Sequence, residues 1–455
     1  MDMPRSQAEK NGERLKIAVV GSGISGLSAA WLLSKRHEVT VYEAESRLGG
    51  HSHTVEVEAD GRRIAVDTGF IVYNEPCYPN LTALFAELGV PTAATDMSFA
   101  VSLDRGRLEY AGKDLAGLVA QPSNLMRPRF WAMVGELLRF YRRAPRDLAT
   151  LGDESLEVYL DRHKFGRAFR EDHLYPMAAA IWSTPAADVG QYPAAAFIRF
   201  CDNHGLLRLT GRPVWRTVIG GSREYVRRLS APFAQSIIKG APVTKIFRDA
   251  AGVDVVDGLG GRRRFDHVVV ATHADQALNL LAAPTDDERR VLGAFRYSLN
   301  EAVLHGDSDL MPRRRAAWAA WNYLSDADGP QRRLSVTYWM NQLQPLGDKP
   351  ELFVTLNPLR QPRPGAVHGR FAYEHPLFDA ETGRAQRELW SLQGVRNTWF
   401  CGAHFGAGFH EDGLQAGLAA AEDLGGPRRP WAVANDSARI FRKAPAAPVY
   451  REAAE

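Results

Sequence analysis

The sequence contains little cysteine, little lysine and no long apolar run. Its 455 residues include three cysteines, Cys77, Cys201 and Cys401, too few and too scattered for a disulfide framework or a cysteine metal site. Apolar runs such as HVVVATHA fall far short of the roughly 20 residues that a membrane-spanning helix needs. The polar start, MDMPRSQAEKNGERLK, lacks the apolar core of a signal peptide. We therefore expect a cytoplasmic protein, and peripheral contact with the inner membrane stays open.

A strong excess of charge of either sign is also absent. The formal net charge is +3, which gives no general reason to expect nucleic acid as a partner. The composition, 45% hydrophobic and 24% charged, is that of an ordinary globular protein. At this length one hydrophobic core is rarely enough, so two or more compact units are expected.

Residues 15–44, LKIAVVGSGISGLSAAWLLSKRHEVTVYEA, predict a strand, a turn, a helix and a second strand. Gly21 permits a tight turn, Gly23 lets the backbone approach a pyrophosphate, and Gly26 allows the helix to pack closely on the strand. The helix directs its first amides and its positive dipole end at the phosphates. Glu43 closes the second strand, where a carboxylate accepts hydrogen bonds from a ribose. The residues expected to bind a dinucleotide here are Gly21, Gly23, Ile24, Ser25, Gly26, Glu43 and Ala44.

A second glycine pair follows in ESRLGGHSHT, residues 45–54. Gly49 and Gly50 allow close backbone approach to the same pyrophosphate, Arg47 supplies a cation and Thr54 a hydroxyl. A nicotinamide enzyme has no need of this second loop, whereas FAD bound in an extended form does. The sequence therefore predicts FAD as the cofactor.

This loop resembles the second flavin motif, Arg-x-Gly-Gly-Arg-x-x-Thr, of the flavin-dependent amine oxidase and phytoene desaturase superfamily. His51 stands where amine oxidases carry the second arginine, and we include it among the cofactor-binding residues. The segment AVDTGF also resembles the Asp-x-Gly segment of this superfamily, through Asp67 and Gly69.

Two distant stretches complete the resemblance. In the middle of the chain it implies a backbone contact with adenine at Val243 and a strand passing the cofactor that ends at Ala271 and Thr272. Near the end, VRNTWFCGAHFGAGFHEDGLQAGL resembles the C-terminal flavin motif, in which Gly402, Gly413 and Leu414 match. There the first amides of a helix face the flavin, and the positive end of its dipole stabilises the reduced, anionic ring.

The resemblance implies an α/β fold, in which a Rossmann-like FAD-binding domain assembled from discontinuous segments carries an inserted α+β substrate domain. We expect Ser222 to cap the helix within VIGGSREYVRRL. The expected boundaries are 14–80, 216–294 and 391–427 for the FAD-binding domain, 81–215 (helical) and 295–390 (mixed sheet) for the substrate domain, and 1–13 and 428–455 for tails.

The candidate catalytic residues lie beside the last motif. Phe409 falls where amine oxidases place an aromatic side chain against the flavin, and a phenylalanine keeps that wall apolar. His404 and His410 flank it and are the nearest imidazoles that could move a proton near neutral pH. No metal site is expected, because the histidines are not spaced as metal ligands.

The inserted segments suggest the substrate, because they contain many aromatic residues and few carboxylates that could bind an ammonium. Residues 125–146, LMRPRFWAMVGELLRFYRRAPR, mix arginines with aromatics, which suits either an anionic lipid surface or a solvated helix face. The phrases GGHSHTV, DTGFIVYN, IWSTP, VTYWMNQLQ and GFHEDGLQAG resemble a bacterial group of NAD/FAD-binding proteins often encoded beside cyclopropane-fatty-acyl-phospholipid synthases. That resemblance implies an acyl-chain substrate.

The leading hypothesis is an FAD-dependent desaturase or dehydrogenase. It transfers a hydride to flavin N5 from an unsaturated or methyl-branched fatty acyl chain, free or phospholipid-bound. Amine oxidation, double-bond isomerisation and a non-catalytic, flavin-stabilised lipid-binding role stay open, as does the oligomeric state.

Overall fold

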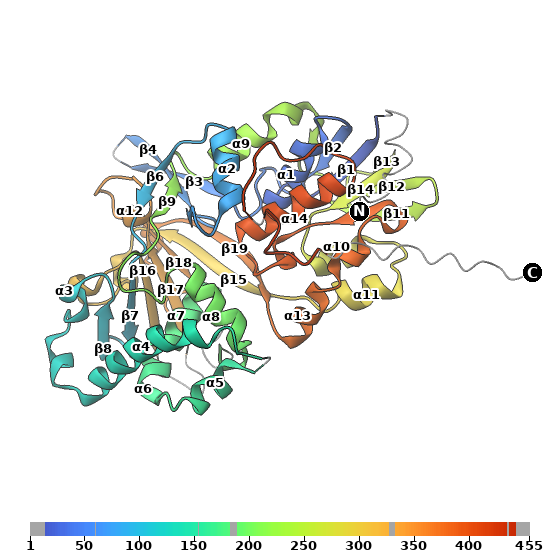
Figure 1. Ribbon diagram of the computed structural model, residues 1–455. Helices are drawn as coiled ribbons and strands as arrows, with labels where there is room; N and C mark the ends of the chain where they lie inside the picture. Colours follow the sequence, from blue (N-terminus) through green and yellow to red (C-terminus); the bar gives the residue numbers. More distant parts are fainter. Residues whose placement is uncertain are drawn as a thin grey trace, which may run out of the picture. The chain divides into compact units, whose positions relative to one another are not determined.

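The computed structural model describes residues 14–59, 61–152, 154–182, 189–326, 333–434 and 436–442. They form two units (Figure 1): unit 1 contains the described residues of 1–48, 230–295 and 381–455, and unit 2 those of 49–229 and 296–380. The expected N-terminal tail, residues 443–455 and the end of the IWSTP phrase lie outside the described residues.

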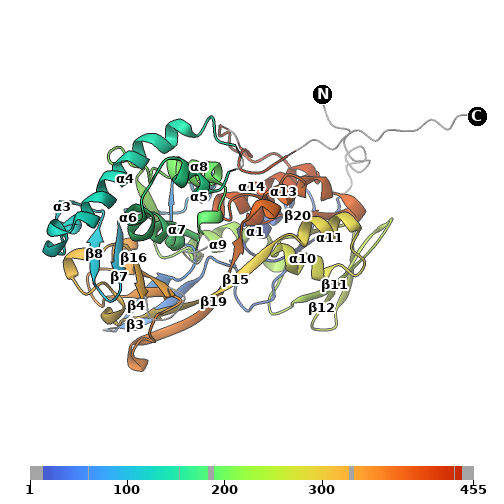
Figure 2. The same cartoon turned by 90° about the horizontal axis from the view of Figure 1, so that it is seen from below.

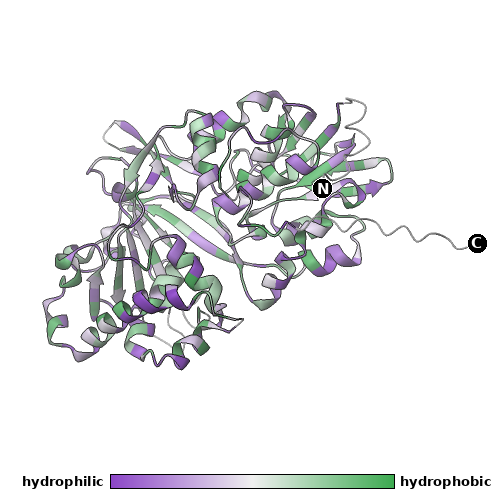
Figure 3. Ribbon diagram, viewed as in Figure 1, coloured by the Kyte–Doolittle hydropathy of each residue, from purple (hydrophilic) through white to green (hydrophobic). Residues whose placement is uncertain are grey.

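Unit 1 is built on a parallel sheet of five strands in the order β10-β2-β1-β14-β20. The strands are β1 (Lys16–Val20), β2 (Glu38–Tyr42), β10 (Ile237–Ile238), β14 (His267–Val270) and β20 (Thr398–Phe400). In β1 and β14 all residues after the first are buried, as expected for a parallel sheet covered on both faces. These strands are largely green, hence hydrophobic, in Figure 3.

The helices of unit 1 include α1 (Ile24–Leu33), α10 (Ala274–Leu280), α11 (Asp286–Leu292), α13 (Ala380–Gln386) and α14 (His410–Asp423). A separate antiparallel sheet contains β11 (Val243–Asp249), β12 (Gly252–Asp257) and β13 (Arg262–Phe265). Helices α1 and α14 lie side by side at very short distance, since a Cβ on Gly417 would fall 2.2 Å from the carbonyl oxygen of Ser25. These elements confirm the Rossmann-like half of the predicted α/β fold.

The expected tail after residue 427 is a correction, because its described part packs on unit 1. Trp431 stacks on Trp31 of α1 with ring centroids 5.9 Å apart. The buried guanidinium of Arg429 pairs with Glu422 of α14 at 2.8 Å, and Ile440 is buried. Stacking and a buried ion pair hold this segment in place, although its proline- and alanine-rich composition suggested a tail.

Unit 2 contains a mixed sheet of seven strands in the order β19-β15-β18-β17-β16-β7-β8. The strands are β7 (Phe99–Leu103), β8 (Leu108–Ala111), β15 (Arg296–His305), β16 (Trp321–Asp326), β17 (Arg333–Trp339), β18 (Phe353–Leu356) and β19 (Val367–Leu377). Two smaller sheets are the hairpin of β3 (Thr54–Ala59) and β4 (Arg62–Asp67) and the sheet of β5 (Val72–Asn74), β9 (Trp215–Val218) and β6 (Thr92–Thr95). The segment 81–215, expected to be helical, thus also supplies β6, β7 and β8.

The helices of unit 2 are labelled in Figure 1, and Figure 2 shows most of them from below. They are α2 (Pro79–Glu87), α3 (Leu115–Leu118), α4 (Pro128–Asp147), α5 (Leu156–Arg162), α6 (Arg167–Phe169), α7 (Tyr175–Trp182), α8 (Ala194–Asn203), α9 (Arg223–Ser230) and α12 (Met340–Leu343). The longest is α4, which buries Phe130, Met133, Phe140 and Ala144 on one face. This apolar stripe joins α4 to the core of unit 2.

The boundary between the units differs from the expected one. Residues 49–80 and 216–229 were expected in the FAD-binding domain, but they belong to unit 2. Strand pairing links both segments to the expected substrate domain, since β6 of that domain pairs with β9, and β9 pairs with β5.

Candidate functional site

The first glycine turn of unit 1 lies where β1 meets α1. Gly21 has a φ of +100°, and a Cβ there would lie 2.9 Å from the carbonyl oxygen of Ala271. A Cβ on Gly26 would lie 2.0 Å from the carbonyl oxygen of Gly21. Both positions are closed by the protein's own backbone. Thr272 also lies beside the turn, since its Cγ2 would be 3.6 Å from a Cβ on Gly21.

Gly23 differs from its two neighbours in the motif. A Cβ built on it meets no atom of the described residues within 4 Å, and its φ of −66° is open to any residue. Gly23 is also the N-cap of α1, and among the residues that the structure describes no side chain caps that helix. Open space in front of a ten-residue helix N-terminus suits a phosphate, because the first amides and the dipole both favour an anion there. The residues present therefore fit the pyrophosphate of FAD.

Glu43 is held directly beside this turn. Its carboxylate accepts hydrogen bonds from the Ser22 amide and the Glu45 amide, each at 2.9 Å, and from the Ser22 hydroxyl. A carboxylate has about four acceptor positions, so it retains capacity for a ribose hydroxyl. The carbonyl oxygen of Glu43 also accepts from the Ala241 amide at 2.9 Å, which brings the start of β11 and Val243 to the same place. Ala44 is exposed, and the Arg47 guanidinium pairs with Glu45 at 2.8 Å.

The C-terminal motif reaches the same turn through α14. A Cβ on Gly413 would lie 3.1 Å from Cγ2 of Ile24 and 3.5 Å from the Ala403 amide nitrogen. Leu414 is buried, and Gly402 is in extended conformation at the end of β20. Ser25, the other first-turn residue of α1, packs its carbonyl group against Gly417. The structure thus brings together three of the predicted segments, from the beginning, middle and end of the chain.

The second glycine pair opens unit 2. Gly49 and Gly50 have φ values of +111° and +56°, and a Cβ on Gly49 would lie 2.6 Å from the carbonyl oxygen of Ser52. The next residue, His51, accepts a hydrogen bond from the Phe70 amide at its carbonyl oxygen, at 2.7 Å. The loop is therefore held by its own backbone and by the Asp-x-Gly segment.

The hydroxyl groups of Thr54 and Ser222 both donate to Asp67. The Thr54 hydroxyl donates to Asp67 at 2.6 Å and accepts from the Arg223 amide at 3.0 Å, so its proton is not available to a phosphate. Ser222 donates its amide and its hydroxyl to Asp67, at 2.9 Å and 2.8 Å. At the start of α9, the Arg223 amide donates to the hydroxyl of Thr54.

Asp67 is the centre of this network and was not predicted as a site residue. Gln344 donates a further hydrogen bond to it at 3.0 Å, and Asp67 returns one from its own amide to the Gln344 side chain at 2.9 Å. Burial raises the pKa of Asp67 to about 6, against the hydrogen bonds from Thr54 and Ser222, which lower it. Asp67 ties the glycine loop, α9 and α12 together within unit 2.

A histidine–tyrosine cluster follows the same loop. The Tyr373 hydroxyl hydrogen-bonds with Nδ1 of His53 at 2.9 Å and with the Thr68 hydroxyl at 2.7 Å. The ring of His51 lies over Tyr373 and His375, with centroids 5.3 Å and 5.7 Å away. We define these four residues, His51, His53, Tyr373 and His375, as the His–Tyr cluster.

Neutral groups position this cluster. Asn300 donates to Nδ1 of His375 at 3.0 Å, and its own carbonyl oxygen accepts from Asn357 at 2.8 Å. Sequence reasoning missed Tyr373 and His375. The signal was the spacing of two in FAYEH, which places Phe371, Tyr373 and His375 on one face of β19.

The predicted catalytic residues lie in unit 1. His404 is buried between Phe295 and Phe405, with ring centroids 5.2 Å and 5.0 Å away, and its Nε2 has no hydrogen-bond partner among the described residues. Burial, and then the charge of His273, lower the pKa of His404 to about 3. This environment argues against His404 as the base.

Phe409 and His410 mark the beginning of α14. Phe409 is its N-cap, and the Phe409 amide donates to Asp412 at 2.8 Å. His410 is the first helical residue and is partly buried. Among the described residues no group of three histidine, cysteine or carboxylate side chains is placed to hold a metal ion.

Comparison with known proteins assigns the family. Residues 24–298, more than half of the chain, match the model of the flavin-containing amine oxidoreductases. A protein of Mycobacterium tuberculosis provisionally named flavin-containing monoamine oxidase AofH is 27% identical over 272 residues, which cover 54% of this chain and 54% of that protein. The chain thus spans about half the length of the curated relatives that it matches first.

Two solved structures share the fold over 90% of this chain. Putrescine oxidase bound to putrescine aligns with a TM-score of 0.63 at 16% identity, over 99% of its own chain. A fatty acid isomerase of P. acnes that produces CLA aligns with a TM-score of 0.59 at 16% identity, over 97% of its chain.

The chain belongs to the flavin-containing amine oxidoreductase family, within the superfamily that its motifs resemble. The family is one of FAD-dependent oxidoreductases, and FAD is the cofactor. The two-domain fold of the amine oxidases is confirmed. In the part of the chain that the structure describes, no helix is long and apolar enough to cross a membrane.

Proposed function

We propose that this protein is an FAD-dependent oxidoreductase that introduces a double bond into an unsaturated or methyl-branched fatty acyl chain. The observation that supports an FAD-dependent enzyme is the open position at Gly23, in front of α1. The other two glycines of the motif, Gly21 and Gly26, are closed by the protein's own backbone. The acyl substrate is supported by the near-full-length resemblance to proteins encoded beside cyclopropane-fatty-acyl-phospholipid synthases and by the aromatic character of the inserted segments.

Bound FAD supplies the acceptor for the hydride that leaves one carbon of the acyl chain. The neighbouring carbon loses a proton to a base, and the electron pair left behind forms the new carbon–carbon double bond. Repeated turnover would also need an electron acceptor from outside the protein. The chain's own residues must therefore bind the pyrophosphate, fix the ribose and take up one proton; α1 and Glu43 serve the first two tasks.

We assign the role of the base that accepts this proton to His51 of the His–Tyr cluster. His51 directly follows Gly49 and Gly50, the pair that the resemblance assigns to FAD, whereas His404 is enclosed by phenylalanines. Its ring lies over Tyr373 and His375, which are hydrogen-bonded and so hold a fixed surface beneath it. His410 and Phe409 stay proposals as residues lining the flavin.

A single-turnover experiment tests the activity. The FAD-loaded protein is mixed without oxygen with methyl-branched or unsaturated fatty acids and with phospholipids that carry them. We expect the flavin absorbance to bleach and an equivalent amount of desaturated product to appear by mass spectrometry. Absence of bleaching with every acyl substrate would refute the proposal.

The same experiment separates the alternatives. Bleaching by polyamines or aryl amines in place of lipids would identify an amine oxidase. Conversion of a lipid without bleaching and without an electron acceptor would identify a double-bond isomerase. Tight lipid binding with no conversion would identify a lipid-binding partner.

Two glutamine variants test the base. General-base catalysis contributes about 10²–10⁴-fold, so we expect His51→Gln to slow flavin reduction by at least about 100-fold. His404→Gln is the matched control and should reduce flavin within about threefold of the wild-type rate, because a weakly basic buried imidazole contributes little. FAD content, measured by absorbance, must be equal in all three proteins. Slow flavin reduction in His404→Gln together with a near-wild-type rate in His51→Gln would identify His404 as the base.

A further inference from the structure

Unit 2 presents a group of large apolar side chains to solvent within a short stretch of sequence. Leu115 is 81% exposed, Leu125 45%, Met126 82% and Trp131 49%. Four of the thirteen exposed large hydrophobic residues in the described chain thus fall within residues 115–131. We define these four as the apolar corner. Scattered single apolar residues are normal on a surface, but a cluster of this kind marks an interaction site.

The apolar corner is a fixed structure. It is formed by α3, by the short 3₁₀ helix η2 (Pro122–Met126) and by the first turn of α4, and the Trp131 indole donates to the carbonyl oxygen of Leu125 at 2.9 Å. Figures 1 and 2 show α3 next to β8 and the start of α4. The exposure of these side chains is therefore a property of the fold.

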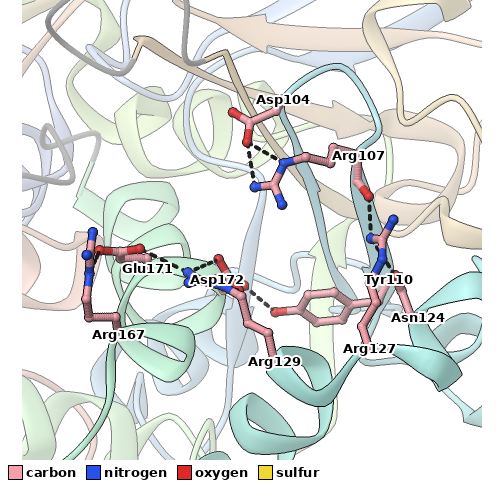
Figure 4. A network of polar contacts seen from close by, with 9 residues as sticks. All are labelled: Asp104, Arg107, Tyr110, Asn124, Arg127, Arg129, Arg167, Glu171 and Asp172. Atoms are coloured by element: carbon pink, nitrogen blue, oxygen red, sulfur yellow. Dashed lines mark hydrogen bonds and ion pairs between the residues drawn. The ribbon is translucent and has the colours of Figure 1, made fainter.

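A polar network includes residues next to the corner in sequence (Figure 4). Arg127 donates to the carbonyl oxygen of Arg107 at 2.5 Å and to the side chain of Asn124 at 3.1 Å. Arg129 pairs with Asp172 at 2.7 Å, which ties α4 to the turn of residues 170–174. Both acceptors of Arg127 are neutral, so its positive charge stays uncompensated by a carboxylate in these contacts.

The same region is basic in sequence. Residues 104–147 contain nine basic and five acidic side chains, a net charge of +4, whereas the whole chain carries +3. Between Lys113 and Arg127 the sequence contains one acidic residue, Asp114, whose carboxylate accepts from the Gly117 amide at 2.6 Å as the cap of α3. Lys113 is exposed. Cations thus flank the apolar corner on both sides in sequence.

Helix α4 continues this pattern along its outer face. At 100° per residue, Arg142 lies about 20° and Arg146 about 60° around the helix from Trp131. Both arginines are exposed, and the Arg142 guanidinium donates to the neutral carbonyl oxygen of Leu138. The opposite face packs into the core of unit 2. An aromatic side chain followed by cations on one solvent-facing side is typical of a helix that lies on a lipid surface.

We infer that the apolar corner and the outer face of α4 dock on an anionic bilayer. Leu115, Leu125 and Met126 enter the acyl boundary, Trp131 lies at the level of the headgroups, and Lys113, Arg142 and Arg146 contact lipid phosphates. Each cation near such a surface contributes to binding, and salt screens that contribution. This surface deepens the proposed function, because it brings the protein to the phospholipids whose acyl chains are the proposed substrate.

Co-sedimentation of the FAD-loaded protein with vesicles tests this surface without any turnover. We expect binding to vesicles of phosphatidylcholine and phosphatidylglycerol in equal parts, weaker binding at high salt, and little binding to phosphatidylcholine alone. Leu115→Glu with Met126→Glu should weaken binding at least tenfold. Leu209→Glu with Leu259→Glu, which are 64% and 71% exposed elsewhere in the chain, should change it less than twofold.

The outcomes separate this inference from the proposed activity. Equal vesicle binding by the two double variants would overturn the assignment of the surface. A protein that does not bind vesicles but self-associates in light scattering would also overturn it, if Leu115→Glu with Met126→Glu abolished the self-association. The surface would then bind a second copy of the chain. The expected pattern of vesicle binding would support the docking surface even if no acyl lipid bleached the flavin.

Discussion

The nucleotide-binding part of unit 1 is made of backbone, whereas the polar centre of unit 2 is made of side chains. In unit 1, glycines place carbonyl groups and a helix N-terminus around one open position at Gly23. In unit 2, Asp67 collects partners that lie 155 and 277 residues away in sequence, Ser222 and Gln344. A site built from a local turn keeps its pattern in the sequence, while a site built from distant side chains does not.

The largest effect is expected from a methyl group in the backbone turn. Gly26→Ala would place a Cβ 2.0 Å from the carbonyl oxygen of Gly21, which no side-chain rotation relieves. We expect a loss of at least about 4 kcal/mol in the free energy of unfolding, measured by urea denaturation. Gly135→Ala in α4 is the control, because a Cβ there would meet no atom of the described chain within 4 Å. Equal stability of the two variants would mean that the turn is not closed as described.

A smaller effect is expected from the side-chain centre of unit 2. Asp67→Asn turns one acceptor into a donor that faces the donating groups of Ser222 and Gln344. The buried donors then lack an acceptor, and we expect a loss of about 2–3 kcal/mol. Urea denaturation measures it beside Asp348→Asn, an exposed carboxylate that should change stability by less than about 0.5 kcal/mol. If Asp67→Asn left the free energy of unfolding unchanged, the stability of unit 2 would not depend on this network.

Acid should act on unit 1 through His404. Its pKa is lowered to about 3 in the fold, so below its ordinary value of 6.5 the unfolded chain binds a proton that the folded chain does not. Stability from this group is therefore present above pH 6.5 and is lost as the pH falls, by about 2 kcal/mol between pH 6.5 and pH 5. His404→Phe removes the titration and should gain that amount on the wild type over this interval in urea unfolding curves. Parallel pH profiles would contradict the burial of a neutral imidazole.

The smallest effect on stability belongs to Gly23. In Gly23→Ala the methyl group enters open space at an ordinary φ, so the protein without FAD should unfold within about 0.5 kcal/mol of the wild type. FAD affinity, measured by flavin fluorescence titration, should fall at least tenfold, since the pyrophosphate needs the same space. Unchanged affinity would show that this position does not face the cofactor.

The sequence was sufficient for the features that depend on local spacing. The glycine turn, the parallel strands around it and the final helix were predicted because each depends on residues a few positions apart. The tail was not, because its contacts with Trp31 and Glu422 depend on tertiary packing that proline- and alanine-rich composition conceals.

The candidate site was predictable in part for the same reason. Thr54 matched a phosphate-binding motif, but its hydroxyl proton is used by Asp67, and no local pattern reveals a competing acceptor. His404 was attractive as an imidazole beside the flavin motif, yet its basicity depends on Phe295, more than a hundred residues away. Tyr373 and His375 became visible once strand β19 was known, because only a strand brings alternate residues to one face.

The stacked rings of Trp31 and Trp431, at an interplanar angle of 22°, have an optical consequence. Two indoles held in a fixed mutual orientation lie in a chiral environment and contribute to the near-ultraviolet circular dichroism of the folded protein. Detachment of the C-terminal segment would erase that contribution while leaving the backbone spectrum intact. The protein thus carries a built-in spectroscopic reporter for the docking of its own end.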